Sequence, residues 1–103
     1  MKNIIKDLII KSLSKIDKSS NISIESIEVS ICKDKKFGDF SSNVSMKFAH
    51  LYDLKPRDLA RKIIHEIEEN DNILKIEVAG PGFINFFVSK NTQFEIIEKI
   101  LED

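Results

Sequence analysis

Residues 74–88 read LKIEVAGPGFINFFV, two apolar runs that are joined by Gly80-Pro81-Gly82. In the first run, Leu74, Ile76 and Val78 alternate with polar or small residues, and this period of two is typical of a β-strand. The Gly-Pro-Gly element is a strong turn former, so the second run is expected to return beside the first. The segment therefore predicts an antiparallel β-hairpin.

The second strand of this hairpin, expected over Phe83 to Val88, has two unlike faces. One face is uniformly apolar and is expected to lie under helices: Ile84, Phe86 and Val88. The opposite face carries a ring, an amide and another ring: Phe83, Asn85 and Phe87. Side chains two apart on a strand lie about 7 Å from one another, which allows Phe83 to stack on a base while Asn85 hydrogen-bonds to its edge. The alternative is that both faces are covered, so that the rings are core and Asn85 bonds to backbone.

The N-terminal half of the chain predicts one helix followed by two strands. Apolar residues recur at steps of three and four over about residues 2–17, which indicates an amphipathic helix. Alternation over residues 27–32 predicts a strand, and a Lys-rich connection leads into a second short strand around residues 37–41. Gly38 in that second strand is expected to serve a bulge or a close approach of two backbones.

Three further helices are indicated by their first residues. Ser42 or Asn43 is expected to cap one helix, Pro56 suits the first turn of the next, and Asn91 or Thr92 is expected to cap the last. The predicted order is α-β-β-α-α-β-β-α. This order describes a two-layer α+β sandwich, a four-stranded antiparallel sheet with helices on one face and the other face open to solvent or a partner.

The composition fits one domain over residues 1–103, with 42% hydrophobic and 32% charged residues. The longest stretch without a charge, residues 78–89, has 12 residues, too few to span a membrane. Lys6 and Asp7 interrupt any signal peptide, and the single cysteine, Cys32, fits a reducing compartment. We therefore expect a cytoplasmic protein without a membrane partner.

The net charge of −1 conceals two unlike halves. Residues 1–64 carry 13 Lys and Arg against 8 Asp and Glu, whereas residues 65–103 carry 3 against 9. Because polyanion binding depends on local positive potential, the basic half is able to face a phosphate backbone. The alternative is that both halves are ordinary solvated surface.

No motif in the chain predicts catalysis or a metal site. His50 and His65 lie on different helical stretches without other ligands at metal-binding spacing, and Cys32 has no histidine near it in sequence. Ser41-Ser42 lacks the glycines that flank a hydrolase serine, and Gly80-Pro81-Gly82 leads into a strand rather than a helix, unlike a phosphate-binding loop.

Three blocks of sequence nevertheless carry a resemblance to a known family. They are FGDFSSN at residues 37–43, KPRDLA at residues 55–60 and VAGPGFINF at residues 78–86. In this order and spacing they resemble the N-terminal additional domain of arginyl-tRNA synthetase, and the match covers about residues 2–100. Each block alone would be weak, but the three in register are specific.

The resemblance implies a tRNA-recognition domain that precedes the catalytic body of an arginine–tRNA ligase and contacts the D-loop corner of tRNA-Arg. In the family, the aromatic residue and the amide of the Gly-Pro-Gly-aromatic-x-Asn stretch contact a D-loop base, and these roles fall on Phe83 and Asn85. Lys33, Lys35 and Lys36, which precede the Gly-Asp motif, are our candidates for phosphate contacts.

The chain contains neither a His-x-Gly-His nor a Lys-Met-Ser-Lys element. The resemblance thus implies that ATP, arginine and magnesium bind to the catalytic body, which is absent here, and that this domain has no cofactor or activity of its own. The expected partners are tRNA-Arg and the catalytic body, with the domain as a monomer. Two alternatives remain: a protein-interaction or dimerisation module that uses the same aromatic face, and a free-standing general RNA-binding domain.

Overall fold

The computed structural model describes residues 2–17, 22–68 and 70–89. Its α-helices are α1 (Lys2–Ile16), α2 (Val44–Phe48) and α3 (Pro56–Glu66), and its strands are β1 (Ser30–Ile31), β2 (Phe40–Ser42), β3 (Ile73–Ala79) and β4 (Phe83–Val88). Short 3-10 helices lie at η1 (Ile24–Ser26), η2 (Lys35–Phe37) and η3 (Ala49–Tyr52). Within these ranges, no helix is long and apolar enough to cross a membrane.

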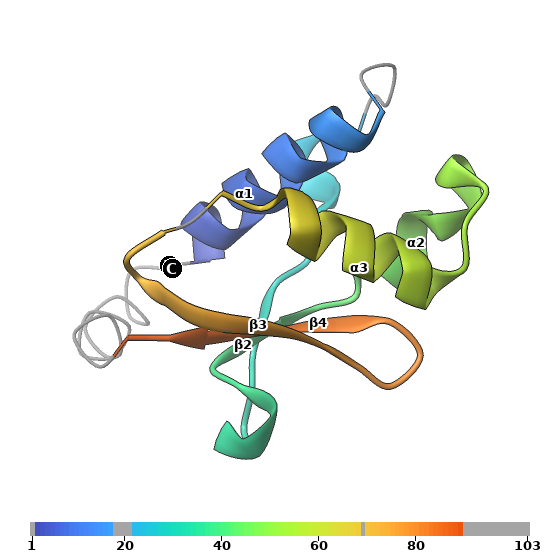
Figure 1. The fold of residues 1–103 in the computed structure, drawn as a ribbon. Coiled ribbons are helices and arrows are strands. Elements are labelled where there is room, and N and C mark those ends of the chain that lie inside the picture. The colour runs from blue at the N-terminus through green and yellow to red at the C-terminus, as the bar shows by residue number, and fades with distance from the viewer. Residues whose placement is uncertain (1, 18–21, 69, 90–103) are drawn as a thin grey trace.

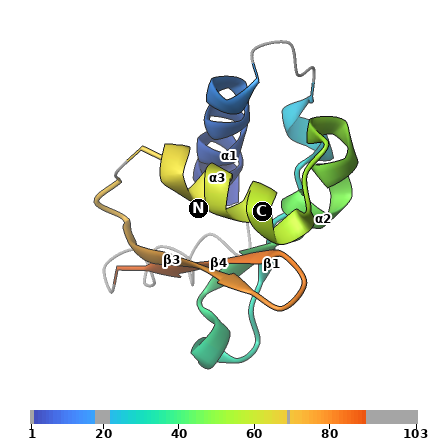
Figure 2. The same cartoon turned by 45° about the vertical axis from the view of Figure 1, so that its right-hand side comes forward.

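The strands form one antiparallel sheet in the order β1-β2-β4-β3. The helices α1, α2 and α3 all lie on one side of this sheet, as two views of the ribbon agree (Figures 1 and 2). The predicted two-layer α+β architecture is therefore confirmed. The predicted last helix, with its cap at Asn91 or Thr92, lies outside the described residues.

The core lies between the helices and the sheet. It is built from one face of each element, and its fully buried members include Ile5, Ile9 and Leu13 of α1, Leu59 and Ile63 of α3, and Ile84, Phe86 and Val88 of β4. Burying each such side chain contributes about 1.5–3 kcal/mol. The hydroxyl of Ser12 donates to the carbonyl oxygen of Ile63 at 2.7 Å, so α1 is also joined to α3 by a buried hydrogen bond.

The first hairpin is shorter than predicted. Ile27 and Val29 are buried as their alternation indicates, yet β1 pairs only over Ser30–Ile31. The carbonyl of Glu28 instead accepts a hydrogen bond from the Ser42 hydroxyl at 2.7 Å, so it does not enter the ladder. β2 begins three residues later than expected because residues 35–37 turn into η2.

The connection before β2 confirms the expected close approach at Gly38. Gly38 has φ +100°, and a Cβ there would lie 2.9 Å from the backbone oxygen of Phe86. The backbone amide of the next residue, Asp39, donates a hydrogen bond to that same oxygen at 2.8 Å. The carboxylate of Asp39 accepts a hydrogen bond from the backbone amide of Val88 at 2.9 Å. The Gly-Asp pair thus fastens this connection to β4.

The predicted alternation of β3 fails at its first residue. The pairing register shifts between Ile73 and Lys75, which is the signature of a β-bulge. Leu74 therefore leaves the buried face and is 69% exposed, while Ile73 and Ile76 pack against the core. An extra residue in a strand cannot be recognised from its side-chain period alone, since the period simply shifts by one.

Candidate nucleic-acid interface

The sheet face opposite the helices is the surface that presents the predicted site. Cross-strand pairing places Ser30, Ser41, Asn85 and Glu77 in one row across the four strands. Phe83 flanks this row at the hairpin end of β4, and Phe87 flanks it at the other end. The predicted division of β4 into an apolar face and a ring-amide-ring face is confirmed, because its three inward residues are all buried.

Phe83 is the accessible ring of this face, with 39% of its surface exposed. Its position is set by the turn before it, because the guanidinium of Arg57 donates to the carbonyl oxygen of Gly80 at 2.8 Å. Gly82 has φ +145°, and a Cβ there would lie 2.8 Å from Cβ of Pro56. The turn is thus seated against the first residues of α3, and it holds Phe83 at the edge of the face.

Asn85 departs from expectation. We expected it to be open to solvent like Phe83, but it is only 5% exposed. It lies on an inner strand between Ser41 and Glu77, with a phenylalanine two residues away on either side, so its short side chain is surrounded. Within the described part of the chain, the amide of Asn85 is not among the buried side-chain polar groups that lack a hydrogen-bond partner.

Phe87 is not available in the way that Phe83 is. The ammonium of Lys75 lies 4.5 Å from the centre of the Phe87 ring, a cation–π contact, and Lys75 also pairs with Glu77 at 3.1 Å. The side chain of Lys75 therefore covers a face of the Phe87 ring. Of the two outward-facing rings of β4, Phe83 therefore remains as the one on which a planar ligand can stack.

The predicted phosphate-binding lysines lie on the connection between β1 and β2. Lys33 and Lys36 are exposed, and Lys35 begins η2. Figure 1 shows η2 on the side of the sheet away from the helices, the same side as the open face. The connection is anchored beside Phe86 and Val88, however, at the opposite end of β4 from Phe83.

Sequence reasoning missed two features of this side. Phe37, within η2, is 57% exposed and lies directly after the lysines. A hollow of about 120 Å³ also lies against Phe83, lined by Glu28, Ser30, Ser41 and Asn43. Its members come from separate stretches of chain, and of these four only Ser41 and Asn43, inside the FGDFSSN block, were marked by a sequence signal.

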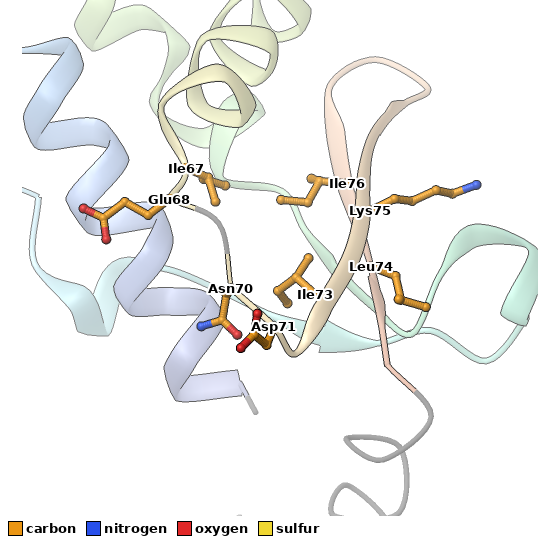
Figure 3. A pocket seen from close by; sticks show the side chains of 8 residues that line it. All are labelled: Ile67, Glu68, Asn70, Asp71, Ile73, Leu74, Lys75 and Ile76. Atoms are coloured by element: carbon orange, nitrogen blue, oxygen red, sulfur yellow. The ribbon is translucent and has the colours of Figure 1, made fainter.

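A larger hollow of about 470 Å³ lies at the far end of β3, where the chain leaves α3 (Figure 3). Ile67, Ile73 and Ile76 point into it, whereas Leu74 and Lys75 point away. Its acidic members, Glu68 and Asp71, make it unsuited to a phosphate backbone, and it contains none of the predicted site residues. Among the described residues no group of three His, Cys, Asp or Glu side chains is placed to hold a metal ion.

Fold and face together define a small two-layer α+β domain that presents the exposed ring of Phe83 beside a polar hollow on its open sheet face. A family model described as the arginyl tRNA synthetase N terminal domain matches residues 3–88, and the chain belongs to this family. The resemblance carried by the three sequence blocks is thereby confirmed.

Similar proteins support this assignment. The chain is 36% identical over 105 residues to the arginine–tRNA ligase of Dichelobacter nodosus, covering 98% of this chain and 18% of that protein. It is 43% identical over 96 residues to the arginine–tRNA ligase of Pseudomonas fluorescens, covering 90% of this chain and 16% of that protein. The chain therefore spans less than a fifth of the length of the relatives that it matches.

Two solved structures share the fold. The arginyl-tRNA synthetase of Thermus thermophilus superposes with a TM-score of 0.72 at 14% identity, over 92% of this chain and 15% of that one. The arginyl-tRNA synthetase of Plasmodium falciparum superposes with a TM-score of 0.69 at 22% identity, over 86% of this chain and 16% of that one.

Proposed function

We propose that this domain binds the D-loop corner of tRNA-Arg and so supports the attachment of arginine by a parent ATP-dependent arginine–tRNA ligase. The single observation that carries this proposal is the ring of Phe83, free and exposed on an open sheet face, in a chain that belongs to the N-terminal domain family of that synthetase. A flat ring at the edge of a sheet is a natural platform for an unstacked base.

The proposal assigns the stacking contact to Phe83. Stacking of a base on an aromatic side chain contributes roughly 1–3 kcal/mol. The support for Phe83 over Phe87 is that Lys75 already covers the Phe87 ring at 4.5 Å. The anchored Gly80 turn adds to this support, because a ring that is already in place loses less conformational entropy on binding.

The proposal assigns recognition of the base edge to Asn85. Its amide lies on the same strand face as the Phe83 ring and two residues from it. This spacing allows one base to stack on the ring while its edge hydrogen-bonds to the amide. The depth of Asn85 means that the base edge has to enter between Phe83 and its neighbours, rather than lie flat on the sheet.

The proposal assigns phosphate contacts to Lys33, Lys35 and Lys36, on the strength of their charge and of the side of the sheet from which their connection projects. A lysine at a phosphate releases condensed counterions, so its contribution falls as salt is added. The distance of this connection from Phe83 along β4 suits an extended RNA strand that crosses the face.

The proposal places the chemistry elsewhere in the parent protein. This chain spans less than a fifth of the length of these relatives, and it lacks the two synthetase elements that would bind ATP. ATP, arginine and magnesium would be held by the catalytic body, which is the second partner of this domain. The contribution of the domain itself is to bind and orient tRNA.

The test is to measure binding of the domain to three transcripts at several salt concentrations: tRNA-Arg, tRNA-Arg with a shortened D-loop, and an unrelated tRNA. We expect weak binding that prefers intact tRNA-Arg and that weakens as salt rises. Equal affinity for all three would overturn the proposal in favour of a general RNA-binding domain.

A further inference from the structure

The hollow beside Phe83 joins three separate parts of the chain. Glu28 comes from the segment before β1, Ser30 from β1 itself and Ser41 from β2. Asn43 is the residue between β2 and α2. Ser41 is paired in register with Asn85, so the hollow is continuous with the row of polar side chains that contains the buried amide. Its volume of about 120 Å³ suits the edge of a ring rather than a whole nucleotide.

Asn43 is placed unusually in this hollow. It stands at the N-cap position of α2, where asparagine ordinarily bonds a free amide of the helix, but it makes no such bond. The hydroxyl of Ser42 accepts the amide of Val44 at 3.2 Å instead. Our expectation that Ser42 or Asn43 caps this helix is therefore met by Ser42 and not by Asn43.

The Asn43 side chain is turned toward Glu28. Its amide nitrogen donates to Oε2 of Glu28 at 3.3 Å, which leaves Oδ1 of Asn43 buried and without a hydrogen bond among the described residues. A buried acceptor without a donor is unfavourable unless a donor is supplied from outside. The orphaned oxygen therefore gives the hollow a preference for a ligand that carries an N–H group.

Glu28 gives the hollow the same preference. Its carboxylate is an acceptor only, and Lys47 lies 3.8 Å from Oε1 while donating to the carbonyl of Ser26 at 3.1 Å. Lys47 thus approaches Glu28 from α2 and does not line the hollow. The hydroxyls of Ser30 and Ser41 rotate to suit either kind of partner.

We infer that Glu28 and Asn43 select the base that stacks on Phe83, by accepting hydrogen bonds from its exocyclic amino group. This inference rests on the proposed function. Adenine and cytosine carry such an amino group, at N6 and N4, whereas uracil presents a carbonyl oxygen, O4, at the corresponding place. A carbonyl set against the Glu28 carboxylate and the Asn43 oxygen leaves acceptors facing acceptors, so uracil is rejected.

The test uses tRNA-Arg transcripts in which each unpaired D-loop base is changed to uridine in turn. With the unaltered domain, we expect one position at which uridine weakens binding about 5-fold or more. At that position, Glu28→Gln, which exchanges one acceptor for an amide donor, and Asn43→Ala, which removes the orphaned acceptor, are expected to reduce the penalty for uridine to less than about 2-fold.

The matched control is Glu25→Gln, an identical change of charge on an exposed η1 residue outside the hollow. It should leave the uridine penalty intact, and thermal unfolding of each variant reports whether the fold survives. A uridine penalty that Glu28→Gln and Asn43→Ala leave unchanged, or the absence of any penalised position while Phe83→Ala still weakens binding, would overturn this inference alone. If Phe83→Ala binds tRNA-Arg as well as the unaltered domain does, the proposed function fails with it.

Discussion

Arg57 donates a hydrogen bond to the carbonyl oxygen of Gly80, with 2.8 Å between Nη1 and the oxygen. This bond joins the KPRDLA block to the Gly-Pro-Gly block, two stretches that are separate in the sequence. The fit of Gly82 against Pro56 reinforces the same junction. The two blocks thus form one structural unit, and this unit fixes the position of the Phe83 ring.

Removing this bond tests the unit. Arg57→Ala should cost about 0.5–1.5 kcal/mol of stability at most, since the bond is exposed. It should weaken binding to tRNA-Arg more than Arg61→Ala does, although both variants remove one arginine from α3. Arg61 pairs with Asp58 of its own helix at 3.3 Å. Equal losses of affinity in the two variants, measured by titration, would show that Arg57 acts through charge and not by holding the turn.

The two faces of β4 give opposite predictions for phenylalanine. Phe86→Ala should destabilise the domain by about 3–5 kcal/mol, because Phe86 is fully buried in the core. Phe83→Ala should cost far less, because its ring is partly exposed on the open face. Urea unfolding of both variants measures the difference, and comparable losses of stability would mean that Phe83 belongs to the core.

The glycines of the hairpin turn also differ. Gly82→Ala should be the more harmful substitution, because its Cβ would meet Pro56 at 2.8 Å with φ at +145°. In Gly80→Ala the new Cβ would lie 3.7 Å from the Phe83 ring, which is an ordinary contact. The loss of stability should therefore come mainly from placing an alanine at φ +55°, which costs about 1–2 kcal/mol. Urea unfolding measures the stability of both variants. If Gly80→Ala is the less stable of the two, the close packing of Gly82 against Pro56 is contradicted.

The lysine connection predicts a change in salt dependence. Replacing Lys33 and Lys36 by alanine should flatten the dependence of log affinity on log salt by about 0.7–0.9 for each phosphate that is no longer neutralised. The control replaces Lys11 and Lys62, two exposed lysines of α1 and α3 in the helical layer. Titrations at several salt concentrations that show the same slope change for both pairs would point to general attraction rather than local contacts.

The alternation of side chains along a strand depends only on neighbouring residues, so it can be predicted from the sequence. It was enough to separate Phe83 from Phe86, and the apolar stripes were enough to place α1 and α3 over the sheet. Burial of Asn85 was beyond such reasoning, because it depends on Ser41 and Glu77 from two other strands.

Side-chain hydrogen bonds and bulges account for the remaining differences. The Ser42 hydroxyl takes the carbonyl of Glu28 out of the ladder and shortens β1, and the same residue replaces Asn43 as the cap of α2. The bulge before Lys75 turns Leu74 outward. The hollow beside Phe83 is lined by residues that are far apart in the sequence, such as Glu28 and Asn43, so it could not be predicted before the fold was known.

The central claim is that the Phe83 ring stacks on a base of tRNA-Arg. Its most direct test compares the affinity of Phe83→Ala for tRNA-Arg with that of Leu51→Ala, which removes an exposed apolar side chain from η3. We predict that Phe83→Ala binds about 5- to 150-fold more weakly, as removal of one stacked base implies, and that Leu51→Ala binds as the unaltered domain does. Unchanged affinity in Phe83→Ala, with the fold intact, would contradict the claim.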